Sequence, residues 1–196
     1  MCSRASLCLA LVSLLPCAGL AQAQPAAAPA HPAAVIAWQQ AFNEALPMLG
    51  ERNWIAIVDA AYPWEGRSGV NTIATRDDQL AVIGEVLKAL KTAPYLKATV
   101  YIDAEMAFVP EARAPGMNDY RAKLKPLLAD QMVTVKPDRE IGKMLDKAAK
   151  SYRVLVLKST LALPYSAIFI QLDRAYWSDE AEAQLREAMK QAGGVQ

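Results

Sequence analysis

Hydrophobic residues follow two alternating patterns along this chain from about residue 35 onward. Short, almost continuous apolar runs are typical of strands that are covered on both faces. Between them, apolar residues return every three or four positions, as on one face of an amphipathic helix. The pattern predicts helices over 35–49, 75–91, 118–131, 138–151 and from 178 onward. It predicts strands over 54–58, 98–102, 132–135, 153–157 and 167–172, with 106–109 considered as a further short strand and 62–74 as a long loop.

This order of elements predicts the fold class. Strands that alternate with helices are typical of a largely parallel sheet with helices packed on it. Pro126 is expected to kink or split its helix, because proline removes a helical hydrogen bond. Residues 35–196 are within the usual size of one domain, about 100 to 200 residues. We therefore expect a single three-layer α/β/α domain with a mainly parallel sheet.

The first residues have the pattern of a signal peptide. Arg4 supplies a positive charge, residues 7–15 an apolar run, and Ala21-Gln22-Ala23 a small-x-small cleavage signal. The apolar run is too short to span a bilayer. Residues 24–34 are rich in proline and alanine and have little to bury, which is typical of a linker. The sequence thus predicts a signal peptide over 1–23, a linker over 24–34, and a periplasmic or secreted domain.

Charge and composition exclude several function classes. The chain has 21 basic and 20 acidic residues, and Arg4 belongs to the predicted signal peptide, so the mature domain is expected to be neutral. A neutral chain gives no support for nucleic acid or an anionic membrane as a partner. The three cysteines, Cys2, Cys8 and Cys17, all lie in the predicted signal peptide, so no disulfide is expected.

Familiar catalytic devices are missing from the expected domain. The single histidine, His31, lies in the predicted linker, which excludes a histidine base or histidine metal ligand in the folded part. No glycine-rich phosphate loop follows a strand, so neither a dinucleotide nor a nucleoside triphosphate is expected. Chemistry must then depend on carboxylate, tyrosine, lysine or arginine side chains. Carboxylates have ordinary pKa values near ~4, so activity should persist into mildly acidic solution.

The segment 49–63 is the most informative stretch of the chain. It contains a glycine at a helix end, the acid Glu51, an apolar strand, the carboxylate Asp59 and an aromatic-proline turn. Ligands of α/β folds bind at the carboxyl ends of strands, where Asp59 is expected. Asp59 could instead be a structural cap, since a buried carboxylate needs a partner. Glu51 could equally be an exposed loop acid.

These residues resemble a known family. The matching motifs are Leu49-Gly50, Ile55-Ala56-Ile57-Val58-Asp59-Ala60 with Tyr62-Pro63, Val154-Leu155-Val156, and Leu163-Pro164-Tyr165-Ser166-Ala167-Ile168-Phe169-Ile170. Together they resemble the opening and closing segments of the D-ribose pyranase and L-fucose mutarotase family. With the order of elements between them, the resemblance covers nearly the whole mature domain.

The resemblance implies a fold, an activity and an assembly. Members of the family interconvert ring forms or anomers of free sugars by acid-base catalysis and use no cofactor. Many form ring-shaped decamers with sites between subunits. For this chain it implies a small-molecule sugar ligand and a homo-oligomer, with a decameric ring as one form.

The resemblance also implies site residues. The family's catalytic histidine falls on Glu51, its sugar-binding aspartate on Asp59 and its site tyrosine on Tyr165. A second histidine of the pyranase branch falls near Gly142 or Lys143, so Lys143 joins Asp59 and Tyr165 as a substrate-binding candidate. A family asparagine falls on Ala167, which cannot hydrogen-bond a sugar.

Two functions remain open from the sequence. The first is an exported sugar-binding protein with mutarotase-like or pyranase-like isomerase activity, in which Glu51 carries the proton. The second is a catalytically inactive relative that acts as a binding or assembly scaffold. Independently of this choice, Tyr165 could simply be a packed aromatic residue whose hydroxyl has a backbone partner.

Overall fold

The computed structural model describes residues 37–193. The predicted signal peptide, 1–23, and the predicted linker, 24–34, lie outside the described residues. Within 37–193, no helix is long and apolar enough to cross a membrane.

Helices and strands alternate through the described part of the chain. The helices, with two short 3₁₀ helices, and the strands are α1 (Trp38–Ala45), η1 (Leu46–Met48), β1 (Trp54–Val58), β2 (Val70–Ala74), α2 (Gln79–Lys91), β3 (Leu96–Asp103), η2 (Ala104–Phe108), α3 (Met117–Leu127), β4 (Met132–Lys136), α4 (Asp138–Ala148), β5 (Val154–Lys158), β6 (Ile168–Arg174) and α5 (Asp179–Gln191).

The strands form one sheet in the order β2-β5-β1-β6-β3-β4. The pairs β2 with β5, β5 with β1, and β3 with β4 are parallel. Strand β6 is antiparallel to both of its neighbours, β1 and β3. Every strand except β6 therefore runs in one direction, which confirms the mainly parallel sheet.

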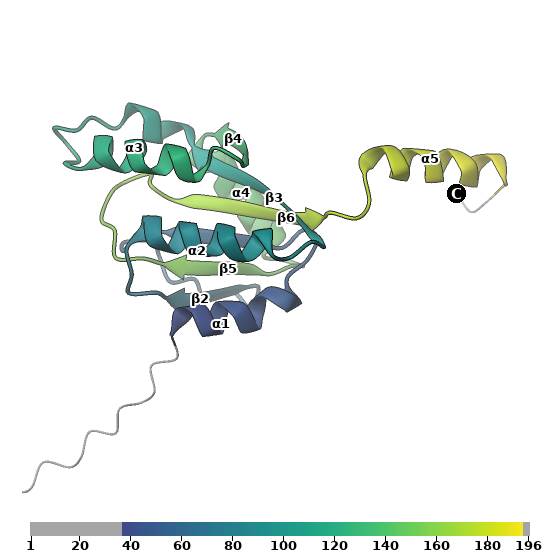
Figure 1. Cartoon of the computed structure of the whole chain (residues 1–196), viewed down its shortest axis with the longest axis horizontal. Helices are drawn as coiled ribbons and strands as arrows, with labels where there is room; N and C mark the ends of the chain where they lie inside the picture. Colours follow the sequence, from purple (N-terminus) through teal and green to yellow (C-terminus); the bar gives the residue numbers. More distant parts are fainter. Residues whose placement is uncertain (1–36, 194–196) are drawn as a thin grey trace, which may run out of the picture. The chain divides into compact units, whose positions relative to one another are not determined.

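Two apolar clusters lie on opposite faces of this sheet. One combines inward side chains of α1, α2 and α3 with Ile55 and Ile57 of β1. The other combines Ile141 and Leu145 of α4 with Ala56 of β1. Alternate residues of a strand point to opposite faces, so neighbours such as Ile55 and Ala56 belong to different clusters. Figure 1 shows α2 and α3 on one side of the sheet and α4 behind it, which confirms the three layers.

Three local predictions differ from the structure. The loop expected over 62–74 contains β2, whose mixed polarity reflects its place at the edge of the sheet. Residues 106–109, considered as a strand, lie mostly in the 3₁₀ helix η2. Pro126 lies in the last turn of α3, where it precedes the helix end instead of kinking the middle.

A buried polar network connects α2, α3 and the segment between β5 and β6. The side-chain amide of Gln79, the first residue of α2, donates to the Ser166 carbonyl at 2.6 Å and to the Tyr120 hydroxyl at 3.0 Å. Its carbonyl oxygen accepts from the Ser159 hydroxyl at 2.9 Å. The Tyr120 hydroxyl donates to the same Ser166 carbonyl at 2.7 Å. Gln79 and Ser166 are fully buried, so the network satisfies groups that water cannot reach.

We expect Gln79→Ala to lower the free energy of unfolding by about 2–4 kcal/mol, because it leaves a cavity and removes a partner of buried polar groups. Urea unfolding measures this change. The control is Gln40→Ala, at an exposed glutamine of α1 that bonds only Glu44 in the same helix at 3.0 Å. It should change stability by less than about 0.5 kcal/mol. Equal losses in the two variants would contradict a structural role of the network.

Gly69, just before β2, is a position where the structure has no room for a side chain. A Cβ there would lie 2.0 Å from the carbonyl oxygen of Ala149 and 2.8 Å from its carbonyl carbon. Gly69→Ala should therefore destabilise the protein by about 1–3 kcal/mol. Gly84→Ala is the control, since a Cβ at this position of α2 meets nothing within 4 Å. It should stabilise by up to about 1 kcal/mol in the same urea assay.

Candidate functional site

One edge of the sheet collects the carboxyl ends of its parallel strands, and we call it the carboxyl edge. Asp59 follows β1, Asp103 ends β3, Lys136 ends β4 and Lys158 ends β5. Strand β6 begins at this edge because it runs the other way. Polar side chains from separate parts of the chain are thus brought to one edge, where α/β folds bind ligands.

Asp59 shapes the loop that follows β1. Its Oδ1 accepts a hydrogen bond from the backbone N–H of Ala61 at 2.7 Å, a local turn typical of aspartate. The N–H of Ala60 donates to the carbonyl of Leu161 at 2.7 Å. The loop after β1 is therefore bonded to the connection between β5 and β6, and Asp59 stays partly exposed beside it.

Tyr165 lies in this β5–β6 connection. Its φ angle of 54° is in the left-handed region, which is unfavourable for a residue other than glycine. The buried network provides a reason for this conformation, since the next residue, Ser166, is held through its carbonyl by Gln79 and Tyr120. The Tyr165 side chain is 44% exposed. Pairing of Ile57 with Ile168 places Asp59 and Tyr165 at the same edge of the sheet.

Lys143 lies in the second turn of α4, five residues after the helix begins at Asp138. Because α4 starts just after β4 ends, its first residues lie at the carboxyl edge, and Lys143 is about 7.5 Å further along the helix. Its side chain is exposed. Three predicted site residues, Asp59, Tyr165 and Lys143, therefore lie at or near one edge.

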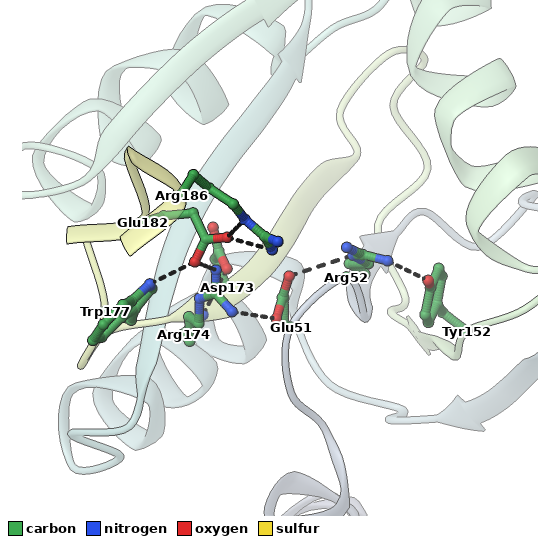
Figure 2. A network of polar contacts seen from close by, with 8 residues as sticks. All are labelled: Glu51, Arg52, Tyr152, Asp173, Arg174, Trp177, Glu182 and Arg186. Atoms are coloured by element: carbon green, nitrogen blue, oxygen red, sulfur yellow. Dashed lines mark hydrogen bonds and ion pairs between the residues drawn. The ribbon is translucent and has the colours of Figure 1, made fainter. Parts of the chain in front are cut away.

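Glu51 lies at the other end of β1. Its carboxylate pairs with the guanidinium of Arg52 at 3.4 Å and with that of Arg174 at 3.5 Å. Figure 2 shows these contacts, with Arg174 between Glu51 and Glu182 of α5. β1 alone, with five residues at ~3.3 Å each, separates the two edges by roughly 16 Å. Within one chain, Glu51 and Asp59 therefore lie at opposite edges of the sheet.

Asp103 is a carboxylate at this edge that the sequence analysis did not single out. Its side chain is 3% exposed, and its Oδ1 has no hydrogen-bond partner among the described residues. Burial, followed by the charges of Asp138 and Glu105, raises the pKa of Asp103 to about 7. The signal that identified Asp59, an acid at the end of an apolar strand, applies to Asp103 as well.

Tyr62 and Lys158 lie next to each other at the carboxyl edge. The Lys158 ammonium donates to the backbone carbonyl of Tyr62 at 2.7 Å. The half-buried Tyr62 ring packs against the cluster under α4, and burial raises the pKa of its hydroxyl. Further along this loop, Arg67 pairs with Asp146 of α4 at 2.7 Å and with Glu65. The loop over 60–68 therefore lies between the sheet edge and α4.

A cavity of about 440 Å³ lies beside α3 and β4, and Asp103 at the end of β3 is one of the residues that line it. Its lining is mainly apolar and includes Met106, Leu124, Leu128 and Val135. A polar ligand such as a sugar suits the carboxyl edge better, because binding sites fix polar ligands through a few placed polar groups. Within residues 37–193 no group of three or more histidine, cysteine or acidic side chains is placed to hold a metal ion.

Comparisons with known proteins gave matches among solved structures. No family model and no curated protein sequence matches the chain. RbsD of Bacillus subtilis, solved with D-ribose, is 20% identical with a TM-score of 0.46, over 68% of this chain and 91% of that one. The fucose mutarotase of Streptococcus pneumoniae, solved with L-fucose, is 14% identical with a TM-score of 0.43, over 68% and 91%.

FucU of Bifidobacterium longum is 17% identical with a TM-score of 0.44, over 68% of this chain and 93% of that one. The structures carry the names of the family that the sequence motifs resemble.

Proposed function

We propose that this chain is an exported protein that binds a free monosaccharide at the carboxyl edge and interconverts its ring forms or anomers. The observation that carries the proposal is that Asp59 and Tyr165, predicted site residues more than a hundred positions apart, occupy loops that hydrogen-bond each other at this edge. The motifs around both residues supply the ligand class through their resemblance to sugar isomerases.

The side chains at this edge suit a polyhydroxylated ligand. A carboxylate such as Asp59 accepts hydrogen bonds from sugar hydroxyls, and the Tyr165 hydroxyl can both donate and accept. The ammonium groups of Lys158 and Lys143 add donors. Ring opening needs a base for the anomeric hydroxyl and an acid for the ring oxygen, and no cofactor is required for either step.

The role of Glu51 requires a second copy of the chain. In one chain Glu51 is at the opposite edge of the sheet, and its carboxylate is engaged by Arg52 and Arg174. In a homo-oligomeric ring, head-to-tail contact brings one edge of a subunit to a different edge of the next. We propose that Glu51 of one subunit completes the carboxyl edge of its neighbour.

A scaffold without catalysis is the second candidate function. It is favoured by the ion pairs of Glu51, which suit a structural role for this side chain, and by the apolar side chain at Ala167. In this case the chain binds a sugar or assembles with itself without turnover.

Asp59→Asn should weaken sugar binding by about 10-fold to 100-fold, because a hydrogen bond to a charged group contributes about 1.5–3 kcal/mol. Asparagine keeps an oxygen that can accept from the Ala61 N–H, so the loop should remain folded. Saturation-transfer NMR against a panel of free aldoses measures the affinity, and exchange spectroscopy measures anomer interconversion. The control is Asp130→Asn, at a side chain that is 82% exposed. Wild-type protein without any sugar response would refute the proposed function.

Glu51→Gln should abolish exchange and largely preserve binding, since the amide keeps the shape and loses the titratable proton. If sites form between subunits, co-expression of Glu51→Gln with Asp59→Asn chains should restore exchange at about one site in four, where two intact residues meet. Light scattering should show an oligomer. A monomer at micromolar concentration, or mixed chains as inactive as each variant alone, would exclude a shared site.

A further inference from the structure

The cavity beside α3 and β4 has no part in the proposed sugar site, and part of its apolar wall is exposed. Val133 and Val135 of β4 line it and are 38% and 58% exposed. They pair with Val100 and Ile102 of β3, so they lie on the face of the sheet that α3 covers. β4 is the last strand of the sheet, and no strand of residues 37–193 flanks it on its outer side. Exposed apolar side chains gathered at a concave surface are typical of a binding site for another segment of protein.

Helix α5 has an apolar face that is also uncovered. Ala181, Leu185, Ala188 and Met189 follow one another at steps of four, three and one residues, which places them on one side of the helix. Leu185 is 43% exposed, and no residue of α5 is buried. This face is about 12 Å long from Ala181 to Met189, at 1.5 Å per residue. Strand β4, with five residues, is roughly 16 Å long. The apolar face of α5 is therefore no longer than the strand that forms one wall of the cavity.

The charges of α5 and of the cavity are opposite in sign. α5 has four acidic and two basic side chains. α3 has three basic side chains and one acidic side chain. Two of the basic residues, Arg121 and Lys125, line the cavity. An amphipathic helix that lays its apolar face into an apolar groove is a recurring mode of protein recognition, and complementary charge at the rim favours the correct partner.

The topology of one chain separates α5 from the cavity of the same chain. Leu96, at the beginning of β3, pairs with Arg174, at the end of β6, and α5 begins just after this point. The cavity lies at the other end of β3, beside Ile102. Six strand residues separate the two ends of β3 by about 20 Å. The ion pair of Arg174 with Glu182 at 3.7 Å holds the first turn of α5 near the end of β6. A second copy of the chain is therefore the occupant that the structure favours.

We propose that α5 of one copy of this chain docks in the cavity beside α3 and β4 of a second copy. Leu185 and Met189 pack against Val133 and Val135, and the acidic side chains of α5 lie near the basic side chains of α3. The contact joins two different surfaces of the chain. It is therefore a head-to-tail contact, the kind that generates rings when the rotation closes.

The docking contact has a consequence for Glu51. The guanidinium of Arg174 lies between Glu51, at 3.5 Å, and Glu182 of α5, at 3.7 Å (Figure 2). The cavity extends to Asp103, at the carboxyl edge. Docking of α5 thus brings Glu51 of one copy toward the carboxyl edge of the next copy. The docking requires no ligand, and only this consequence rests on the proposed function.

Light scattering and sedimentation velocity over a concentration series of the purified protein test the contact. The wild-type protein should be larger than a monomer. Leu185→Glu should weaken self-association by about 10-fold to 100-fold, because it removes a buried leucine side chain from the contact. The control is Ala183→Glu, which adds the same charge on the opposite side of α5 and should keep the wild-type mass. Both positions are exposed, so circular dichroism should show the same helix content in all three proteins.

Val135→Glu tests the cavity and should weaken self-association to a similar extent. Its control is Met132→Glu, at an exposed position of β4 whose side chain points to the other face of the sheet. A mixture gives the sharpest result. Leu185→Glu chains keep an intact cavity and Val135→Glu chains keep an intact α5, so the two should form a one-to-one complex that cannot extend further.

Three results would overturn the docking of α5. They are a monomeric wild-type protein, a Leu185→Glu variant with the wild-type mass, and Leu185→Glu and Val135→Glu chains that do not combine. Loss of association in Val135→Glu alone would assign the cavity to a different segment of the second copy.

The sugar assays separate this inference from the proposed function. Sugar exchange by a monomeric wild-type protein overturns the docking and leaves the isomerase intact. An oligomer that depends on Leu185 and Val135 but shows no sugar response supports the docking and removes the proposed function.

Discussion

The carboxyl edge depends on the hydrogen bonds of one buried side chain. Gln79 begins α2, and its amide bonds three groups that come from α3, from the end of β5 and from the approach to β6. A buried amide has donors and an acceptor that must all be satisfied, so few other side chains could occupy this position. The left-handed conformation of Tyr165 persists next to this network, because the carbonyl of Ser166 cannot turn away without leaving buried donors unpaired.

The direction of β6 determines which residues meet at this edge. A parallel strand in its place would bring its carboxyl end, Asp173 and Arg174, to the side of Asp59. Because β6 is antiparallel, its beginning lies there, with Tyr165 and Ser166 just before it. The same reversal carries Arg174 to the opposite edge, where it pairs with Glu51. The direction of β6 therefore determines which of its ends lies at the side of Asp59 and which lies at the side of Glu51.

The sequence predicted most of the fold because apolar periodicity reports burial directly. Strand β1 was placed correctly at 54–58, since five successive apolar residues between polar ones leave little choice. Strand β2 was missed because an edge strand with Asn71 and Thr72 has no apolar run. The position of Asp59 at a strand end could be read from the pattern. The burial of Asp103 could not, since it depends on α4 and η2 packing over β3, and its raised pKa follows from that packing. The roles predicted for Glu51, Asp59, Tyr165 and Lys143 stay predictions.

Helix α5 differs from α1, α2, α3 and α4 in how it is held to the rest of the chain. None of its residues is buried, and polar contacts join it to the preceding segment: Arg174 pairs with Glu182 at 3.7 Å, and the Trp177 ring N–H donates to Glu182 at 2.8 Å (Figure 2). Attraction between exposed charges falls with ionic strength, whereas apolar packing does not. The salt concentration around the protein therefore affects how α5 is held, whereas the helices that pack on the sheet are held by buried apolar side chains.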